Sequence, residues 1–180
     1  MDQSTTQWVN SFAGSNAILD WIMIVASEFG VPTLIIFVGL QWWSKRERLS
    51  IRHTCVAAGL SFVIALGLNQ IILLFVHRVR PYDAGLTHLI VSRSGDWSFP
   101  SDHATASLAI ATAFLFHRVW RRAFVLLAGA LLICVSRVYI GTHYASDVLG
   151  GAVTGIVAAL VVRSLYWEGT WADRFITGLL

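Results

Sequence analysis

The chain has 180 residues, of which 56% are hydrophobic and 13% are charged, and its formal net charge at pH 7 is +3. A soluble domain carries about twice that share of charged residues, so the composition excludes an ordinary water-soluble protein. The basic residues stand in groups beside apolar runs, which is typical of membrane topology signals and not of nucleic-acid binding.

The N-terminal segment precedes the first apolar run and mixes Trp8, Val9 and Phe12 with polar residues. Two interpretations fit this composition: a short helix lying in the membrane interface, and a disordered lead. The first residues lack the basic stretch that begins a signal peptide, so we expect no cleavage.

Five apolar runs follow, each a candidate for crossing a hydrocarbon layer of about 30 Å. The third is short, at about 25 Å if it is fully helical. The sequence therefore predicts an all-α fold: a polytopic membrane helix bundle with about five transmembrane helices and an N-terminal interfacial helix as an option, forming one domain over residues 1–180. We place the runs at Ile18–Trp43, Thr54–His77, Ser101–His117, Ala123–Ile140 and Asp147–Tyr166.

The basic residues predict the orientation of this bundle. They gather after the first, third and fifth runs, and cytoplasmic loops of membrane proteins carry such an excess. We therefore expect the N-terminus outside and the C-terminus inside. The residues on the predicted inner side are Lys45, Arg46, Arg48, Arg52, Arg118, Arg121, Arg122, Arg163 and Arg174.

Glu28 lies well inside the first apolar run, and Asn69 lies midway along the second. An acid within a membrane helix faces the bundle interior or a wet cavity, and is a functional-site hypothesis. The alternative is a structural hydrogen bond from Glu28 to the pair Asn69-Gln70. Cys55 and Cys134 lie in or beside apolar runs and are most simply small core residues.

Residues suited to phosphoryl chemistry stand at the outer ends of the second to fifth runs, so folding in the membrane gathers them on one face. Arg80 and Arg137 present planar forks that match phosphoryl oxygens. Snorkelling to lipid phosphates is the alternative for both, and Arg78 is a weaker candidate of the same kind. Because clustered arginines disfavour a bound cation, we expect no metal and no other cofactor.

His143 and Asp147 are four residues apart, which on a helix places them on one face. An Asp so placed can hold an imidazole in one tautomer while the other nitrogen acts as nucleophile or general base. A purely structural hydrogen bond is the alternative. His103 follows the helix-start residues Pro100 and Ser101, near backbone N–H groups that can bind an anion. His103 could protonate a leaving oxygen or contact lipid headgroups, and spacing alone does not say which histidine attacks.

Together these residues resemble the membrane type 2 phosphatidic acid phosphatase family, within the acid phosphatase and vanadium haloperoxidase superfamily. That family's pattern is K-x6-R-P, then P-S-G-H, then S-R-x5-H-x3-D. The third motif is complete from Ser136 to Asp147, the second reads Pro100-Ser101-Asp102-His103, and the first keeps Arg80-Pro81.

Two departures stand out. The family lysine falls on Leu73, which cannot bind phosphate, so its contact is missing or supplied by Arg78. Asp102 replaces the motif glycine, and we expect it to turn away from the substrate or to meet Arg78 or Arg80. Both departures are similar to those of the bacitracin-resistance type of undecaprenyl pyrophosphate phosphatase, as are Asn16-x-x-Leu19-Asp20 ahead of Glu28 and Asn69 ahead of Arg80-Pro81.

The resemblance implies a covalent mechanism without a metal. His143 would attack the terminal phosphorus to give a phosphohistidine, and Asp147 would stabilise the imidazolium. His103 would protonate the leaving phosphate and then activate water. The candidate substrate-binding residues are Arg80, Arg137, Ser101, Asp102 with its neighbouring N–H groups, Arg78, Glu28 and Asn69.

The resulting expectation is a bacterial inner-membrane phosphatase that converts undecaprenyl pyrophosphate to undecaprenyl phosphate at the periplasmic face. Its partner would be a polyprenyl pyrophosphate lipid, with no nucleic acid, and it would serve lipid-carrier recycling for cell-wall synthesis. The runner-up is the same chemistry on phosphatidylglycerol phosphate or phosphatidic acid. A non-catalytic lipid-phosphate binder or flippase, and a haloperoxidase, are the alternatives from other classes. The sequence leaves the lipid tail length and the oligomeric state open.

Overall fold

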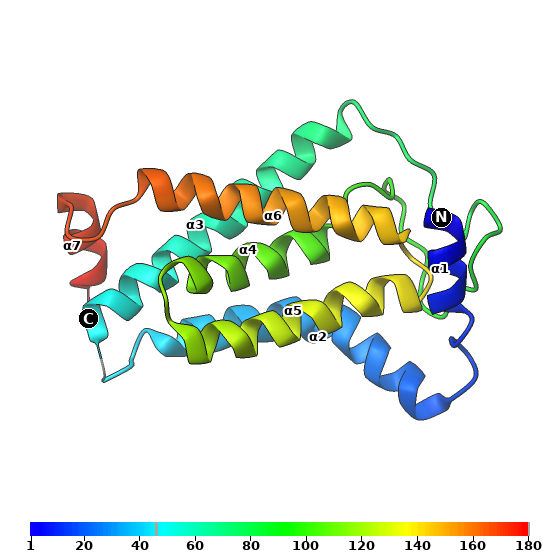
Figure 1. The fold of residues 1–180 in the computed structure, drawn as a ribbon, viewed down its shortest axis with the longest axis horizontal. Coiled ribbons are helices and arrows are strands. Elements are labelled where there is room, and N and C mark those ends of the chain that lie inside the picture. Colours follow the sequence, from blue (N-terminus) through cyan, green and yellow to red (C-terminus); the bar gives the residue numbers. More distant parts are fainter. Residues whose placement is uncertain (46, 180) are drawn as a thin grey trace.

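The computed structural model describes residues 1–45 and 47–179, and within them the secondary structure is entirely helical. Helices α2 to α6 lie side by side along the long axis, α1 crosses one end, and α7 lies at the other end with the C-terminus (Figure 1). The all-α prediction is confirmed. The helices are α1 (Asp2–Asn10), α2 (Ala17–Gln41), α3 (Arg48–Leu73), α4 (Asp102–Phe116), α5 (Trp120–Tyr139), α6 (Ala145–Leu165) and α7 (Trp171–Thr177).

The five predicted runs correspond to α2 to α6, but they are not equivalent. Four of them, α2, α3, α5 and α6, are long and apolar enough to cross a membrane. The remaining helix, α4, corresponds to the third run. It has 15 residues and is therefore only about 22 Å long. It is buried without interruption from Ala104 to Phe114 and packs against α3, α5 and α6. The third run is thus the centre of the bundle, and its apolar character is explained by its neighbours more than by lipid.

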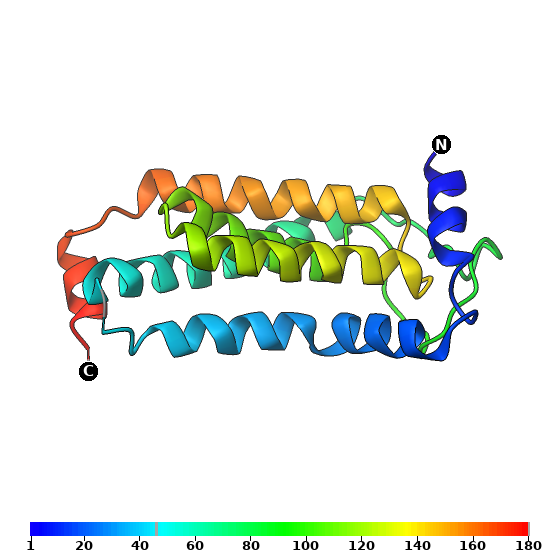
Figure 2. The ribbon, with the colours of Figure 1, turned by 60° about the horizontal axis from the view of Figure 1, so that its bottom comes forward.

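Figure 2 shows α2 along one edge of the bundle, with α5 and α4 between it and α6. The closest helix packing joins α6 to α4 through Gly151 and Gly155. A Cβ atom at Gly151 would lie 2.5 Å from the backbone oxygen of Ser101, and one at Gly155 would lie 2.5 Å from that of Thr105. Both glycines therefore let α6 approach α4 closely. Cys55 and Cys134 are free thiols in the core, as predicted.

The second run begins earlier than predicted, because α3 starts at Arg48 and includes Arg52 and His53. Hydropathy ends a run at a charged residue, but here Arg52 is buried and bonded to the chain. Its guanidinium donates to the backbone oxygens of Trp42, at 3.1 Å, and Thr177, at 2.7 Å. At its other end α3 stops at Leu73, so the predicted extension to His77 is wrong.

The N-terminal segment is neither disordered nor confined to the lipid interface, because α1 packs on the bundle itself. Thr6 and Asn10 are buried. The Asn10 amide donates to the backbone oxygens of His88, at 2.9 Å, and Tyr139, at 2.7 Å. This ties α1 to the loop after α3 and to the end of α5.

Helix α7 was not predicted, since its seven residues are too few to give the hydropathy signal of a membrane span. It is held by Asp173, whose Oδ1 lies 2.8 Å from Nδ1 of His53 and 2.6 Å from the Tyr166 hydroxyl. A cluster of polar contacts therefore closes the end of the bundle opposite α1.

Candidate active site

The predicted site residues meet at the end of the bundle covered by α1. The site is built from the loop between α3 and α4, the short loop between α5 and α6, and the first turns of α4 and α6 (Figure 1). Side chains 60 or more residues apart in the sequence, such as Arg80 and His143, come into contact there.

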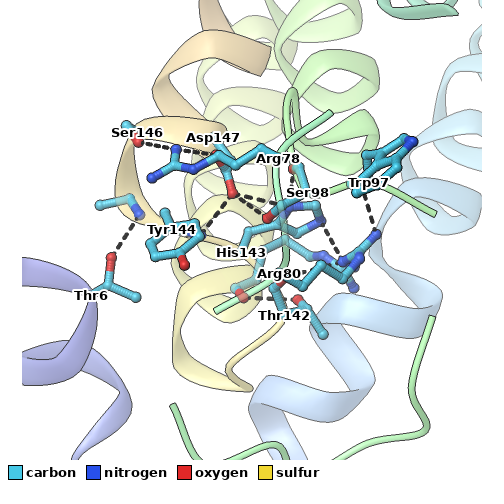
Figure 3. Close-up of polar contacts among 12 residues, drawn as sticks. Thr6, Arg78, Arg80, Trp97, Ser98, Thr142, His143, Tyr144, Ser146 and Asp147 are labelled. Atoms are coloured by element: carbon cyan, nitrogen blue, oxygen red, sulfur yellow. Dashed lines mark hydrogen bonds and ion pairs between the residues drawn. The ribbon is translucent and has the colours of Figure 1, made fainter. Parts of the chain in front are cut away.

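His143 lies in the loop before α6, and the whole residue is only 3% exposed. Its Nδ1 is 2.7 Å from the backbone oxygen of Ser98. Because a carbonyl oxygen only accepts, Nδ1 carries the proton of the neutral ring and Nε2 is left unprotonated. Nε2 lies 3.4 Å from Nη1 of Arg80 (Figure 3). The nitrogen available for attack is therefore Nε2.

Asp147 is fully buried and satisfied by three donors. Its Oδ2 accepts from the Ser98 hydroxyl at 2.5 Å and from the Tyr144 backbone N–H at 2.9 Å, and its Oδ1 accepts from Nη1 of Arg78 at 2.5 Å. The nearest distance to Nδ1 of His143 is 3.7 Å. Asp147 thus acts on the ring by charge, while the Ser98 carbonyl fixes the tautomer.

The expected helical relation of His143 and Asp147 is wrong. Tyr144 is the N-cap residue of α6, and the Asp147 carboxylate accepts a hydrogen bond from its backbone N–H. Helix α6 therefore begins at Ala145, and the histidine precedes it. The i, i+4 spacing still brings the two residues together, but through a capping turn in place of a helical face.

Arg80 is buried and fully occupied. Its Nη1 donates to the Thr142 oxygen at 3.0 Å, its Nε donates to the Asp96 backbone oxygen at 3.0 Å, and its Nη2 donates to Oδ1 of Asp96 at 2.7 Å. Partial burial of Asp96 opposes ionisation, but hydrogen bonds from Ser94 and Arg80 and the Arg80 charge outweigh it and lower the pKa of that carboxyl. Sequence reasoning missed Asp96.

A cavity of about 100 Å³ lies in front of His143. Arg137 and Asp96 face it, and Leu73, at the position of the family lysine, forms an apolar part of its wall. Arg137 bonds the Ser27 hydroxyl, and its buried Nε has no hydrogen-bond partner among the described residues. The cavity is therefore lined both by the His143 ring and by a guanidinium whose Nε has no partner in the described structure. Its lining is Leu73, Arg80, Ser94, Asp96, Trp97, Pro100, Asp102, His103, Arg137 and His143.

His103, the second residue of α4, stands where three cavities meet. It lines the cavity in front of His143 and a second polar cavity of about 270 Å³ that contains Glu28 and Arg137. It also lines an apolar cavity of about 180 Å³. The apolar cavity is bounded by Val31, Phe62, Leu66, Asp102 and Ala106, from α2, α3 and α4.

Asn69 and Glu28, the polar residues within the apolar runs, have different surroundings in the structure. Asn69 donates to Oδ1 of Asp102 at 2.7 Å and to the Thr105 hydroxyl at 2.9 Å. Asn69 is therefore the hydrogen-bond partner of Asp102. The other expected partners, Arg78 and Arg80, form no hydrogen bond with Asp102 in the described part of the chain. The alternative hydrogen bond between Glu28 and Asn69 is not formed in the described part of the chain, and Glu28 instead lines the 270 Å³ cavity.

Two further candidates lie beside the cavity and not in it. The Arg78 guanidinium reaches behind Asp147 to Asp2 and Ser146, so it does not take the place of the missing lysine. Ser101 is buried, and its backbone N–H donates to the backbone oxygen of Asp147 at 3.1 Å. Its hydroxyl has no partner among the described residues.

Burial lowers the pKa of His143 below its usual value. The charges of Arg137 and Arg80 lower it further, and Asp147 offsets only part of this. The ring is therefore neutral near pH 7 and ready to act as a nucleophile. In residues 1–45 and 47–179 no group of three or more His, Cys, Asp or Glu is placed to hold a metal ion. The arrangement offers a neutral histidine, a second histidine and arginine donors around a space for a tetrahedral anion.

Comparison with known proteins agrees with this chemistry. The family profile described as PAP2 superfamily matches residues 54–171. Undecaprenyl-diphosphatase BcrC of Bacillus subtilis is 33% identical, over 83% of this chain and 76% of its own length. Putative undecaprenyl-diphosphatase YbjG of Escherichia coli is 32% identical, over 77% of this chain and 67% of its own length.

A solved structure shares the fold. The crystal structure of a transmembrane PAP2 type phosphatidylglycerolphosphate phosphatase from Bacillus subtilis superposes with a TM-score of 0.65 at 23% identity. The match covers 90% of this chain and 84% of the other. At this identity the likeness concerns the arrangement of helices alone.

Proposed function

The chain belongs to the PAP2 superfamily and is a membrane-bound lipid phosphatase, and from this premise we propose that its substrate is undecaprenyl pyrophosphate, hydrolysed to undecaprenyl phosphate. Membership in a phosphatase family sets aside the non-catalytic binder, the flippase and the haloperoxidase. The choice of lipid rests on the two relatives named as undecaprenyl-diphosphatases.

The observation that carries the proposal is the position of His103 between a polar and an apolar cavity. The polar cavity contains Arg137 and His143, and the apolar one lies between α2, α3 and α4. A polyprenyl pyrophosphate combines the two chemistries at one point, because its anionic end is joined directly to a hydrocarbon tail. The bond to be broken would then lie beside His103.

In the proposed reaction Nε2 of His143 attacks the terminal phosphorus. The bond from that phosphorus to the bridging oxygen breaks, and the departing lipid monophosphate takes a proton from His103. His103, now unprotonated, removes a proton from water, and the resulting hydroxide attacks the phosphohistidine. Inorganic phosphate leaves and the His143 ring returns to its neutral form.

The charge of the transferred phosphoryl group would be balanced by the protein. Arg137 lines the cavity and has an unpartnered Nε in the described structure, and Arg80 would exchange its bond to Asp96 for the substrate. The first N–H groups of α4, next to Asp102, lack intrahelical acceptors and favour an anion. Ser101 is proposed to act with this helix start. We propose that the reaction needs no metal.

We further propose that the site faces the periplasm across the bacterial inner membrane. The basic residues lie mainly at the end of the bundle opposite the site, where the positive-inside rule places the cytoplasm. Of the residues used in that prediction, Arg46 lies outside the described part of the chain.

The mechanism is tested by H143N in purified, detergent-solubilised enzyme. We expect phosphate release from a polyprenyl pyrophosphate to fall by at least about 10³-fold, as for loss of a covalent nucleophile. Vanadate should inhibit the wild type, and a chelator should leave its activity unchanged. An H143N enzyme that unfolds at the wild-type temperature and still releases phosphate would falsify the covalent step.

The substrate is tested separately with a panel of lipids presented to the wild-type enzyme. We expect the highest kcat/KM for undecaprenyl pyrophosphate. Phosphatidylglycerol phosphate is the second candidate, because the structural neighbour is named for it. A clear preference for a glycerophospholipid rejects the leading substrate and leaves the reaction type intact.

A further inference from the structure

Helix α1 touches the catalytic dyad through a chain of charges that neither the family motifs nor the proposed mechanism uses. We propose that Asp2 of α1 is a positioning residue for catalysis, which shares Arg78 with Asp147 and thereby keeps negative charge beside the His143 ring. This inference rests on the proposed role of His143 as the nucleophile.

Asp2 joins α1 to the start of α6. Its Oδ2 accepts from Nη2 of Arg78 at 2.6 Å and from the Ser146 hydroxyl at 2.7 Å. Its Oδ1 accepts from the Ser146 backbone N–H at 2.9 Å. Thr6, one turn further along α1, accepts from the Ala145 backbone N–H at 3.0 Å. Helix α1 therefore supplies acceptors for the first two N–H groups of α6, the helix that carries Asp147.

Arg78 bridges the two carboxylates, with one amino group on each. Its Nη2 faces Asp2, and its Nη1 donates to Oδ1 of Asp147 at 2.5 Å and to the Ser146 hydroxyl at 2.6 Å. The guanidinium carbon lies 3.8 Å above the centre of the Tyr144 ring. This stacking and the bonds from both amino groups fix the guanidinium in one orientation.

The charges along this chain explain why Asp2 matters. Asp147 acts on His143 by charge, since the Nδ1 proton goes to the Ser98 oxygen at 2.7 Å. Arg78 alone would cancel the charge of Asp147. With Asp2 the group of two carboxylates and one guanidinium keeps a net charge of −1. As Nε2 forms a bond to phosphorus the ring becomes positive, and this remaining negative charge stabilises it.

The contact could instead be structural and serve only to dock α1, and a matched pair of variants separates these roles. D2N keeps an oxygen for the Ser146 N–H but removes the charge and turns an amide toward Arg78. T6V removes the acceptor of the Ala145 N–H and leaves Arg78 untouched. Both variants weaken the docking of α1, but only D2N changes the charge next to Asp147.

We expect D2N to lower kcat about tenfold, the scale of one charge-assisted contact, with KM within about twofold. T6V should lower the unfolding temperature while leaving kcat at the wild-type value, and D2E should recover most of the activity lost in D2N. The assay is phosphate release, in detergent, from whichever phosphorylated lipid the wild type hydrolyses best.

Two results would overturn the inference: a wild-type kcat in D2N, or equal losses of kcat in D2N and T6V. The H143N enzyme, assayed alongside, keeps this outcome apart from that of the proposed function. If H143N is inactive and D2N behaves as wild type, the role of Asp2 fails and the nucleophile stands. If H143N retains activity, the proposed mechanism itself fails.

Discussion

At the scale of single residues, the site is defined by which acceptor each donor finds. The tautomer of His143 is set by a backbone oxygen of a loop 45 residues away, that of Ser98. Arg80 and Arg137 both line the cavity with a guanidinium group, but they differ in how far its N–H groups are hydrogen-bonded. Arg80 is neutralised by Asp96, whereas Arg137 has a buried Nε without a partner in the described structure.

This difference predicts the effect of D96N. The Asp96 carboxylate holds the Nη2 group of Arg80, at 2.7 Å, that a phosphate oxygen would bind. Removing its charge frees Arg80, so we expect vanadate and inorganic phosphate to inhibit D96N with inhibition constants about tenfold lower.

The measurement is inhibition of lipid phosphate release, with S92A as the control in the same loop. Ser92 lines the larger polar cavity but makes no hydrogen bond with Arg80 in the described structure. An unchanged or higher inhibition constant in D96N would show that Asp96 orients Arg80 and does not compete for it.

At the scale of elements, α4 is the helix on which the others assemble. It starts at the site with His103, ends inside the bundle, and is the one apolar run too short to be a full membrane span. Two glycines of α6 let that helix approach it closely. Because Asp147 and His103 lie at the starts of α6 and α4, this contact also sets the distance between the two halves of the site.

Gly155→Ala is therefore expected to destabilise the protein. Its new Cβ would meet the backbone oxygen of Thr105 at 2.5 Å and the backbone nitrogen of Ala109 at 2.9 Å, neither of which can rotate away. We expect a loss of about 1–3 kcal/mol in the free energy of unfolding.

The control is Gly67→Ala in α3, where a Cβ meets nothing within 4 Å. There the change should be neutral or stabilising by up to about 1 kcal/mol, because alanine favours a helix over glycine. Unfolding in detergent measures both, and equal stabilities would contradict the close-packing role of Gly155.

At the scale of the whole molecule, the five helices of the bundle put the two chain ends at opposite ends of the molecule (Figure 1). The proposed catalytic residues collect with α1 at one end, and the His53–Asp173 contact closes the other. Such a separation of chemistry and basic loops fits a protein with one face on each side of a membrane.

The proposed orientation predicts a pattern of cysteine labelling in intact cells. With Cys55 and Cys134 replaced by serine, Ala84→Cys lies in the exposed loop near the site and Glu168→Cys in the exposed segment before α7. A membrane-impermeant maleimide should label the first in intact cells and the second only after permeabilisation. The reverse pattern would place the site on the cytoplasmic side.

The sequence by itself determined the helical class, the five apolar runs and most of the chemistry. The motif residues His103, His143, Asp147, Arg80 and Arg137 do meet at one end of the bundle, because successive helices run antiparallel and so bring alternate helix ends together. Their catalytic roles stay predictions for the experiments above. Hydropathy and motif spacing are local signals, and these features are local.

The tertiary structure alone decided what depends on contacts between distant segments. Examples are the Ser98 oxygen at His143, the Asp96 carboxylate on Arg80, and the use of Arg78 by Asp2 and Asp147. The direction of a donor depends on the loop that faces it, and a short helix such as α1 is stabilised by what it packs against. Neither property can be predicted from the spacing of residues along the chain.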